Sequence, residues 1–595
     1  MREPKSEEKA TERNKPAVKR SKWIFWVVLS MFGFAVVSQA AVQGLKSEQI
    51  LENAVRAHRY TSKVVDQSQR GSIFSSDGQV LAQDYEQAEL SIRFDRVPKS
   101  TAFFAALSVA SGIPASDFAE MARSGQTSRT WSSALSPAQA AAVNRVKTEW
   151  RADGVSVSKS GVRRYPLGAS AGLIVGKMLD GKPTMGIELS FDEHLTGQDG
   201  RTIGLLDRDG QFLPMRVKKH ESVRSDGQNL TLTIDAELQQ EAFDAVRAGV
   251  EAHNAERGMA IILDPKTGDI LSMVNYPSFD PLSSDVVAEE GSRESTFSGT
   301  TMGIYEPGSI FKVLTICAAL EEGVITPSSV THCEGSYRFG PYKVACHDRG
   351  SVKVHGSLNT TDVIAKSCNV ISAKWAHRIG RDKFFDFIDR SGVLERPDIG
   401  LGGVQAGRLN RNDYARQLQL ANLGFGQAIN VTPLAFADAV AMIGNEGVRM
   451  RPRLVKKIGD REIPPEQVGR VVSADTAAKA LGVMEAVIEG ESGTGKRMRV
   501  PGYRLAGKTG TAQKLGSAKE RAYVANFVGF VPAENPRALI LVMVDTPRAG
   551  QIFGGQVAGP IFTEIAKAVI RRYGILPDTN SVTAMGKNRP RTPWN

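Results

Sequence analysis

The segment 306–312 reads Glu-Pro-Gly-Ser-Ile-Phe-Lys and is followed by an apolar run over 313–320. A serine and a lysine three positions apart lie on one face of a helix, so the amine of Lys312 can reach the hydroxyl of Ser309. The proline favours a first helical turn here, which places Ser309 near the positive end of the helix. Because a serine hydroxyl is a weak nucleophile without a neighbouring base, the segment predicts Ser309 as a nucleophile and Lys312 as its base.

Two other Ser-x-x-Lys matches, 6–9 and 156–159, lack both the Pro-Gly entry and the apolar run, and we interpret them as exposed surface. The match at Ser309 differs because two further motifs follow it. These are Ser-Cys-Asn at 367–369 and Lys-Thr-Gly-Thr at 508–511. The three motifs in this order are typical of serine β-lactamases and penicillin-binding proteins.

A second Lys-Thr-Gly, at 266–268, lies between the strand-like runs 259–263 and 270–274. Short apolar runs separated by a Gly-containing segment predict a β-hairpin. We therefore interpret 266–268 as a turn with a structural role.

The composition is that of an ordinary globular protein. The chain has 595 residues, 41% hydrophobic and 23% charged, which is enough for two or three domains. The net charge of +11 suits a protein that works beside an anionic membrane or polymer, and it equally suits a basic soluble surface. We find no zinc-type Cys/His spacing and no phosphate-binding glycine loop, so we expect no metal, no organic cofactor and no nucleic-acid partner.

The N-terminus predicts a membrane anchor. Residues 23–42 form an uncharged run long enough to span about 30 Å of hydrocarbon as a helix. Residues 1–22 carry eight Lys/Arg against four Glu, which favours a cytoplasmic tail at 1–22, an anchor at 23–43 and a large part outside the inner membrane. A cleaved signal peptide is the alternative, since Ser-Gln-Ala at 38–40 fits a cleavage site.

The four cysteines are Cys317, Cys333, Cys346 and Cys368. We expect Cys317 and Cys368 to be buried packing residues. Cys333 and Cys346 flank a short loop, and in an oxidising exterior they could form a disulfide.

Patterning along the chain predicts an α+β protein. We expect a helical stalk at 45–60 within a non-catalytic pedestal or dimerisation-type domain, 44–230, a catalytic domain at 231–575 and a disordered tail at 576–595. In the catalytic domain we expect an antiparallel sheet with flanking helices and a helical subdomain. The expected helices are 237–252, 311–322, 361–378, 433–445 and 563–573, and the expected strands besides the hairpin are 503–510, 526–532 and 538–544.

The chain resembles the class B penicillin-binding proteins, which are membrane-anchored peptidoglycan D,D-transpeptidases. Beyond the three motifs, the resemblance covers about residues 60–575 and includes these segments: 70–73, 164–166, 186–188, 232–235, 424–427 and 553–555. The length, the single anchor and the short tail are most similar to the septal, FtsI-type branch, and the elongation-type branch is the alternative.

The resemblance implies a two-step acyl transfer in which Ser309 attacks the D-Ala-D-Ala bond of a stem peptide. Ser367 would relay a proton to the leaving amine and Asn369 would orient Lys312 and the substrate. Lys508, Thr509 and Thr511 would hold the substrate carboxylate, and Gly510 would permit close approach of the backbone. We also predict a lowered pKa for Lys312, from burial and from the charge of Lys508.

The same resemblance implies β-lactams as covalent inhibitors, and a SEDS-type glycosyltransferase, FtsW, with other division proteins as partners. A β-lactamase would need an acid to hydrolyse its acyl-enzyme, and the nearest matching segment, 406–410, has glycine and arginine at the relevant positions. The motifs are also compatible with a D,D-carboxypeptidase, with a β-lactam sensor and with a scaffold that has lost its activity.

Overall fold

The computed structural model describes residues 15–44, 61–179, 181–205, 218–283, 296–348, 351–411, 417–514 and 522–578. The chain divides into two compact units, one of Met1–Arg70 with Thr196–Gly227 and one of Gly71–Leu195 with Gln228–Asn595. The expected stalk at 45–60, most of the cytoplasmic tail and nearly all of the C-terminal tail lie outside the described residues. The domain boundaries expected from the sequence stay predictions.

The first unit contains one long apolar helix and a small sheet. Helix α2 (Lys15–Gly44) includes Lys22–Ala41, a stretch long and apolar enough to cross a membrane. The sheet is antiparallel, in the order β1-β8-β9, with bounds β1 (Thr61–Asp66), β8 (Gly200–Leu205) and β9 (Lys218–Ser222). Next to it, the carboxylate of Asp199 accepts hydrogen bonds from the backbone and hydroxyl of Ser68, at 2.8 and 2.9 Å.

The N-terminal part of the second unit is built on a sheet in the order β21-β20-β10-β2-β3-β4, with β5 also paired to β3. Its strands are β2 (Ile73–Phe74), β3 (Val80–Arg93), β4 (Ser128–Leu135), β5 (Val155–Arg164), β10 (Leu230–Leu232), β20 (Val455–Ile458) and β21 (Arg461–Glu462). Strands β3, β4 and β5 share a core with α4 (Thr101–Ser111), α5 (Ala115–Arg123) and α6 (Pro137–Glu149). A buried ion pair joins Arg163 to Glu188 at 2.7 Å.

The catalytic part is an antiparallel sheet of five strands in the order β12-β11-β25-β24-β23. The strands are β11 (Arg257–Leu263), β12 (Ile270–Tyr276), β23 (Ala506–Gln513), β24 (Tyr523–Val531) and β25 (Ala538–Asp545). The predicted hairpin at 259–274 is confirmed as β11 and β12, and the Lys-Thr-Gly between them is its turn. There Gly268 has φ +76° and its N–H donates to Asp264 at 2.9 Å.

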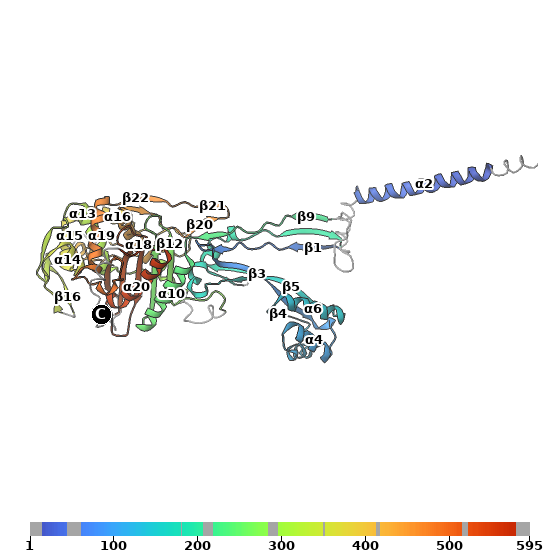
Figure 1. The fold of residues 1–595 in the computed structure, drawn as a ribbon, viewed down its shortest axis with the longest axis horizontal. Coiled ribbons are helices and arrows are strands. Elements are labelled where there is room, and N and C mark those ends of the chain that lie inside the picture. Colours follow the sequence, from blue (N-terminus) through green and yellow to red (C-terminus); the bar gives the residue numbers. More distant parts are fainter. Residues whose placement is uncertain are drawn as a thin grey trace, which may run out of the picture. The chain divides into compact units, whose positions relative to one another are not determined.

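Both faces of this sheet are buried by helices. Along β25, Leu539, Leu541 and Met543 face one core while the intervening residues face another, because side chains alternate along a strand. One face is covered by α10 (Ala236–Ala252) and α20 (Gly554–Arg572), which lie side by side in Figure 1. The other face packs against α13 (Lys312–Glu321), α18 (Pro433–Ala441) and α19 (Ala474–Glu489).

Two of the predicted helices were wrong in extent. The helix expected at 361–378 is two helices, α14 (Thr360–Ala365) and α15 (Asn369–Ile379), because Ser367 between them has a left-handed backbone with φ +56°. The last helix begins at Gly554 and not at Thr563. Its first turns contain three glycines and Pro560, and because glycine and proline have low helix propensities the sequence does not predict a helix there.

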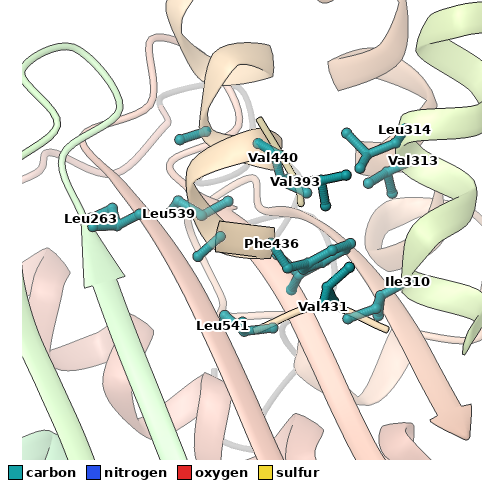
Figure 2. Packing of buried hydrophobic residues seen from close by; sticks show 14 of the residues in the cluster. Leu263, Ile310, Val313, Leu314, Val393, Val431, Phe436, Val440, Leu539 and Leu541 are labelled. Atoms are coloured by element: carbon teal, nitrogen blue, oxygen red, sulfur yellow. The ribbon is translucent and has the colours of Figure 1, made fainter. Parts of the chain in front are cut away.

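The core beneath the catalytic helix is centred on Phe436 of α18. Figure 2 shows its ring among Ile310, Val431 and Leu541, and it is fully buried. We expect Phe436→Ala to lower the free energy of unfolding by about 3–5 kcal/mol, because lost burial and the residual cavity add. Denaturant unfolding checks this against Val109→Ala, which removes a side chain that is 89% exposed. Equal losses in the two variants would contradict the prediction.

Candidate active site

Ser309 lies in a 3-10 turn, η4 (Gly308–Phe311), that leads directly into α13. Gly308 has φ +57°, a conformation that favours glycine, and its N–H donates to the carbonyl of Gly426 at 2.9 Å. A side chain at Gly426 would lie 2.1 Å from the carbonyl of Gly308. The two glycines therefore fix the turn that presents Ser309.

Lys312 contacts the other three predicted catalytic residues. Its side chain is fully buried, and its Nζ lies 3.1 Å from Ser309 Oγ. The same nitrogen lies 2.8 Å from the carbonyl and 3.0 Å from the hydroxyl of Ser367, and 2.6 Å from Asn369 Oδ1. The structure thus brings together all four residues for which the sequence predicts catalytic roles.

Proton counting constrains the charge of Lys312. Its Nζ has four polar neighbours, but an ammonium carries three hydrogens and a neutral amine two. The Ser367 carbonyl and Asn369 Oδ1 can only accept, whereas the hydroxyls of Ser309 and Ser367 can donate. A neutral amine would donate to the two obligate acceptors and accept from a hydroxyl, which is the arrangement required of a base.

The electrostatics agree in direction. Burial lowers the pKa of Lys312 to about 8. Burial also holds the pKa of Lys508 well below its usual value, and the charge of Lys312 lowers it further. Burial therefore lowers the pKa of Lys312, in the expected direction. The repulsion between the two amines lowers the pKa of Lys508 and not that of Lys312.

If Lys312 is the base, as the sequence predicts, only its neutral amine can accept the serine proton. We therefore expect the rate of acylation by a β-lactam to rise about tenfold per pH unit up to about pH 8 and to level off above it. Rapid-mixing measurements of the second-order rate constant from about pH 6 to about pH 9.5 check this. A flat profile over that range would contradict it.

Ser367 connects the two lysines. Its hydroxyl lies 3.0 Å from Lys508 Nζ as well as 3.0 Å from Lys312 Nζ. The left-handed backbone of Ser367 turns both its hydroxyl and its carbonyl toward Lys312. A non-glycine residue in this conformation is strained, and such strain is concentrated at functional sites.

Strand β23 carries the third motif at the edge of the sheet. Lys508 Nζ donates to the carbonyl of Thr509 at 2.8 Å, and the Thr509 hydroxyl lies 3.0 Å from the hydroxyl of Thr494. The hydroxyl of Thr511 accepts from the N–H of Gly554 at 3.1 Å. A side chain at Gly510 would lie 1.9 Å from Asn526 Oδ1, so this position must be glycine.

A cleft of about 580 Å³ opens over these groups. It is lined by Ser309, Ser367, Asn369, Thr509, Gly510 and Thr511, together with a loop at 493–497. Four basic residues line it, Lys353, Lys366, Lys496 and Arg497, and among the described lining residues there is no acidic one. Sequence reasoning missed these basic residues, although Ser-Gly-Thr-Gly-Lys-Arg at 492–497 is a glycine-rich basic segment that could have indicated them.

The two remaining Ser-x-x-Lys matches take no part in this site. Ser156 and Lys159 lie on β5, where residues three apart point to opposite faces. Ser6 lies outside the described residues.

The cysteines lie beneath the cleft. All four are buried free thiols, as expected for Cys317 and Cys368. The sulfurs of Cys333 and Cys346 are 3.9 Å apart and unbonded, and Cys346 lies nearer to Cys368, at 3.6 Å. The hydrogen bond with Cys368 lowers the pKa of Cys346, and the same contact together with burial raises the pKa of Cys368. The disulfide stays a prediction.

Two family models match the chain. The penicillin binding protein transpeptidase domain matches residues 258–567, and the penicillin-binding protein dimerisation domain matches residues 65–184. The first covers the catalytic sheet and all three motifs.

Named relatives agree. The chain is 32% identical to the peptidoglycan D,D-transpeptidase FtsI of Escherichia coli over 73% of this chain and 71% of the relative. It is 33% identical to the penicillin-binding protein PbpB of Mycolicibacterium smegmatis over 71% of this chain and 66% of that protein.

Among solved structures, penicillin binding protein 3 of Mycobacterium tuberculosis, complexed with aztreonam, superposes with a TM-score of 0.64 at 26% identity. The superposition covers 87% of this chain and 98% of that one. The chain therefore belongs to the penicillin-binding protein transpeptidase family, as a class B penicillin-binding protein of the peptidoglycan D,D-transpeptidase type.

Proposed function

We propose that this protein cross-links peptidoglycan stem peptides through an acyl-enzyme on Ser309, during septum formation in cell division. The observation that carries the chemistry is the buried Nζ of Lys312, within 3.1 Å of Ser309 Oγ and 3.0 Å of Ser367 Oγ. Lys312 takes the proton of Ser309 as the hydroxyl attacks the carbonyl between the last two D-alanines. The N–H groups of Ser309 and Thr511 receive the developing oxyanion.

The leaving D-alanine needs a proton on its amine. Ser367 Oγ lies 3.0 Å from both lysine nitrogens, so it can pass a proton from the amine pair to the leaving group. Asn369 accepts a hydrogen bond from Lys312 at 2.6 Å and lines the cleft, so it can orient both the lysine and the substrate. An amine of a second stem peptide then attacks the acyl-enzyme and forms the cross-link.

Substrate binding follows from the edge position of β23. An extended peptide can add to an unpaired strand edge by backbone hydrogen bonds, with its carboxylate near Lys508, Thr509 and Thr511. An arriving carboxylate restores the positive charge of Lys508, because an opposite charge raises a lowered lysine pKa. The basic residues of the cleft attract the same anionic end.

Hydrolysis of the acyl-enzyme has no evident base. The described residues lining the cleft include no carboxylate that could activate a water molecule. In the segment 406–410, which is the nearest match to a deacylation loop, Arg408 is held by backbone pairing with Asn430. The absence of such a base supports a long-lived acyl-enzyme. A long-lived acyl-enzyme is expected of a transpeptidase that β-lactams inhibit, and not of a β-lactamase.

The septal role, the partners and the membrane topology rest on similarity to FtsI and on the apolar helix Lys22–Ala41. We propose a single pass through the inner membrane with the catalytic domain outside, and a polymerising SEDS-type glycosyltransferase such as FtsW as partner. Depletion of the protein with time-lapse imaging tests the role. Filamentous cells with labelled protein at midcell support septum formation, and rounded cells with dispersed label would favour the elongation role.

A further inference from the structure

We infer that Cys333, Cys346, His355 and Cys368 form a zinc site directly beneath the active-site cleft. One ligand atom from each residue lies within 4.8 Å of all the others. The residues come from four separate segments that converge only in the folded chain: the end of β13 (Val330–Cys333), the junction after β15 (Tyr342–Ala345), the turn before β18 (Gly356–Asn359) and the loop before α15. Three thiolates and one imidazole are a common donor set for structural zinc.

Three of the six ligand–ligand distances match those of a tetrahedron around one ion, and the other three are at most 4.8 Å. Zinc bonds of about 2.3 Å to sulfur and about 2.0 Å to nitrogen place two sulfurs about 3.8 Å apart, and a sulfur and a nitrogen about 3.6 Å apart. The sulfurs of Cys346 and Cys333 are 3.9 Å apart, and those of Cys346 and Cys368 are 3.6 Å apart. The distance from Cys333 Sγ to His355 Nδ1 is 3.6 Å.

The surroundings fit bound thiolates. The backbone N–H of Gly335 donates to Cys333 Sγ at 3.4 Å, and that of Val370 donates to Cys346 Sγ at 3.4 Å. Hydrogen bonds of this kind orient and tune metal-bound sulfurs. The three cysteines are at most 3% exposed, and Cys346 and His355 line the active-site cleft, so the cluster is buried and borders the site directly.

A disulfide explains the cluster less well. Cys346 lies about equally near two other thiols, so a bond to either would leave the third thiol and His355 without a role. Four protein ligands fill a tetrahedral shell, which assigns the ion a structural role, since catalytic zinc keeps a position open. Binding transfers the thiol protons to solvent and changes no oxidation state.

A bound metal would stabilise the segment between Cys333 and Gly356. Its described residues form two-stranded ribbons, β14 (Ser336–Phe339) with β15 and β16 (His347–Asp348) with β17 (Ser351–Val352). Isolated two-stranded ribbons are marginally stable. A metal that ties both ends of this segment to Cys368 would hold it against the catalytic helices.

The consequence for catalysis rests on the proposed function. Cys368 stands between Ser367 and Asn369, so a bond from its sulfur to the ion fixes the strained loop that directs both residues at Lys312. The ligands are therefore positioning residues for the second motif.

The test measures metal in the full-length chain, purified in detergent without a polyhistidine tag. Elemental mass spectrometry should find about one zinc per chain in the wild type and at least about tenfold less in Cys333→Ser and His355→Gln. Cys317→Ser is the matched control, because Cys317 is also a buried free thiol but lies outside the cluster, and it should keep its zinc. Full zinc in the ligand variants, or loss in the control, would overturn the inference.

A second measurement uses only the wild type, in case the variants fail to fold. After reduction and chelation, one equivalent of cobalt(II) should produce the thiolate charge-transfer and tetrahedral bands of a sulfur-rich site. Absence of these bands overturns the inference, and so does a non-reduced mass about 2 Da below that of the four-thiol chain.

A third readout separates this inference from the proposed function. Chelation should slow labelling by fluorescent penicillin at least about fivefold, and one equivalent of zinc should restore the rate. Zinc without any labelling would sink the transpeptidase proposal and leave the metal site standing. Rapid labelling of a chain that contains no zinc would reject the metal site and leave the transpeptidase proposal standing.

Discussion

Ser309→Ala is expected to abolish covalent labelling by fluorescent penicillin and to lower the cross-linking rate by about 10⁴-fold or more. The reason is that we propose Ser309 Oγ as the atom that carries the acyl group, and no other described hydroxyl has the same relation to Lys312 and the cleft. Ser367 Oγ also lies near Lys312, but its strained backbone and its contact with Lys508 favour the proposed role in proton transfer. Gel fluorescence after incubation with the labelled antibiotic measures the result.

The chain supplies its own control for this experiment. Ser156→Ala removes the serine of the same Ser-x-x-Lys spacing on strand β5 and should label like the wild type. Persistent labelling of Ser309→Ala would reject the assignment and show that another residue is the nucleophile. Full rescue of depleted cells by Ser309→Ala would favour a scaffold without activity.

Lys312→Met is expected to slow acylation by about 10²–10⁴-fold, the usual contribution of a positioned base. Methionine is close to lysine in length and suits a fully buried position, so the loss reports the missing amine more than a cavity. The residual acylation should no longer rise toward pH 8, because the group that titrates there is gone. Rapid-mixing kinetics of acylation at several pH values provide both numbers.

Lys266→Met is the matched control, since Lys266 belongs to the Lys-Thr-Gly of the β11–β12 turn. It should leave both the rate and the pH profile unchanged. A Lys312→Met variant that keeps the wild-type pH dependence would show that another group is the base.

Most of the regular structure could be predicted from local pattern. The apolar run over 538–544 became the central strand β25, and Asp235 caps α10 by accepting the N–H of Leu238 at 3.0 Å. These elements follow from side-chain periodicity and from caps, which act over a few residues. The break at Ser367 was missed because it depends on partners far along the chain, namely Lys312 and Lys508.

The sequence by itself determined the three motifs and their order, and from these it predicted the family, which the comparisons confirm, and the nucleophile, which stays a prediction. Each motif can be recognised from the sequence because its residues lie within a single helix turn, loop or strand, where local spacing fixes their relation. Only the tertiary structure decided that one hydroxyl bridges two buried lysines, that the repulsion between these lysines lowers the pKa of Lys508 and not that of Lys312, and that Cys333, Cys346, His355 and Cys368 meet. The metal cluster escaped sequence reasoning because its ligands lack the short spacings of zinc motifs, and it takes strand pairing and a helix break to bring them within 4.8 Å.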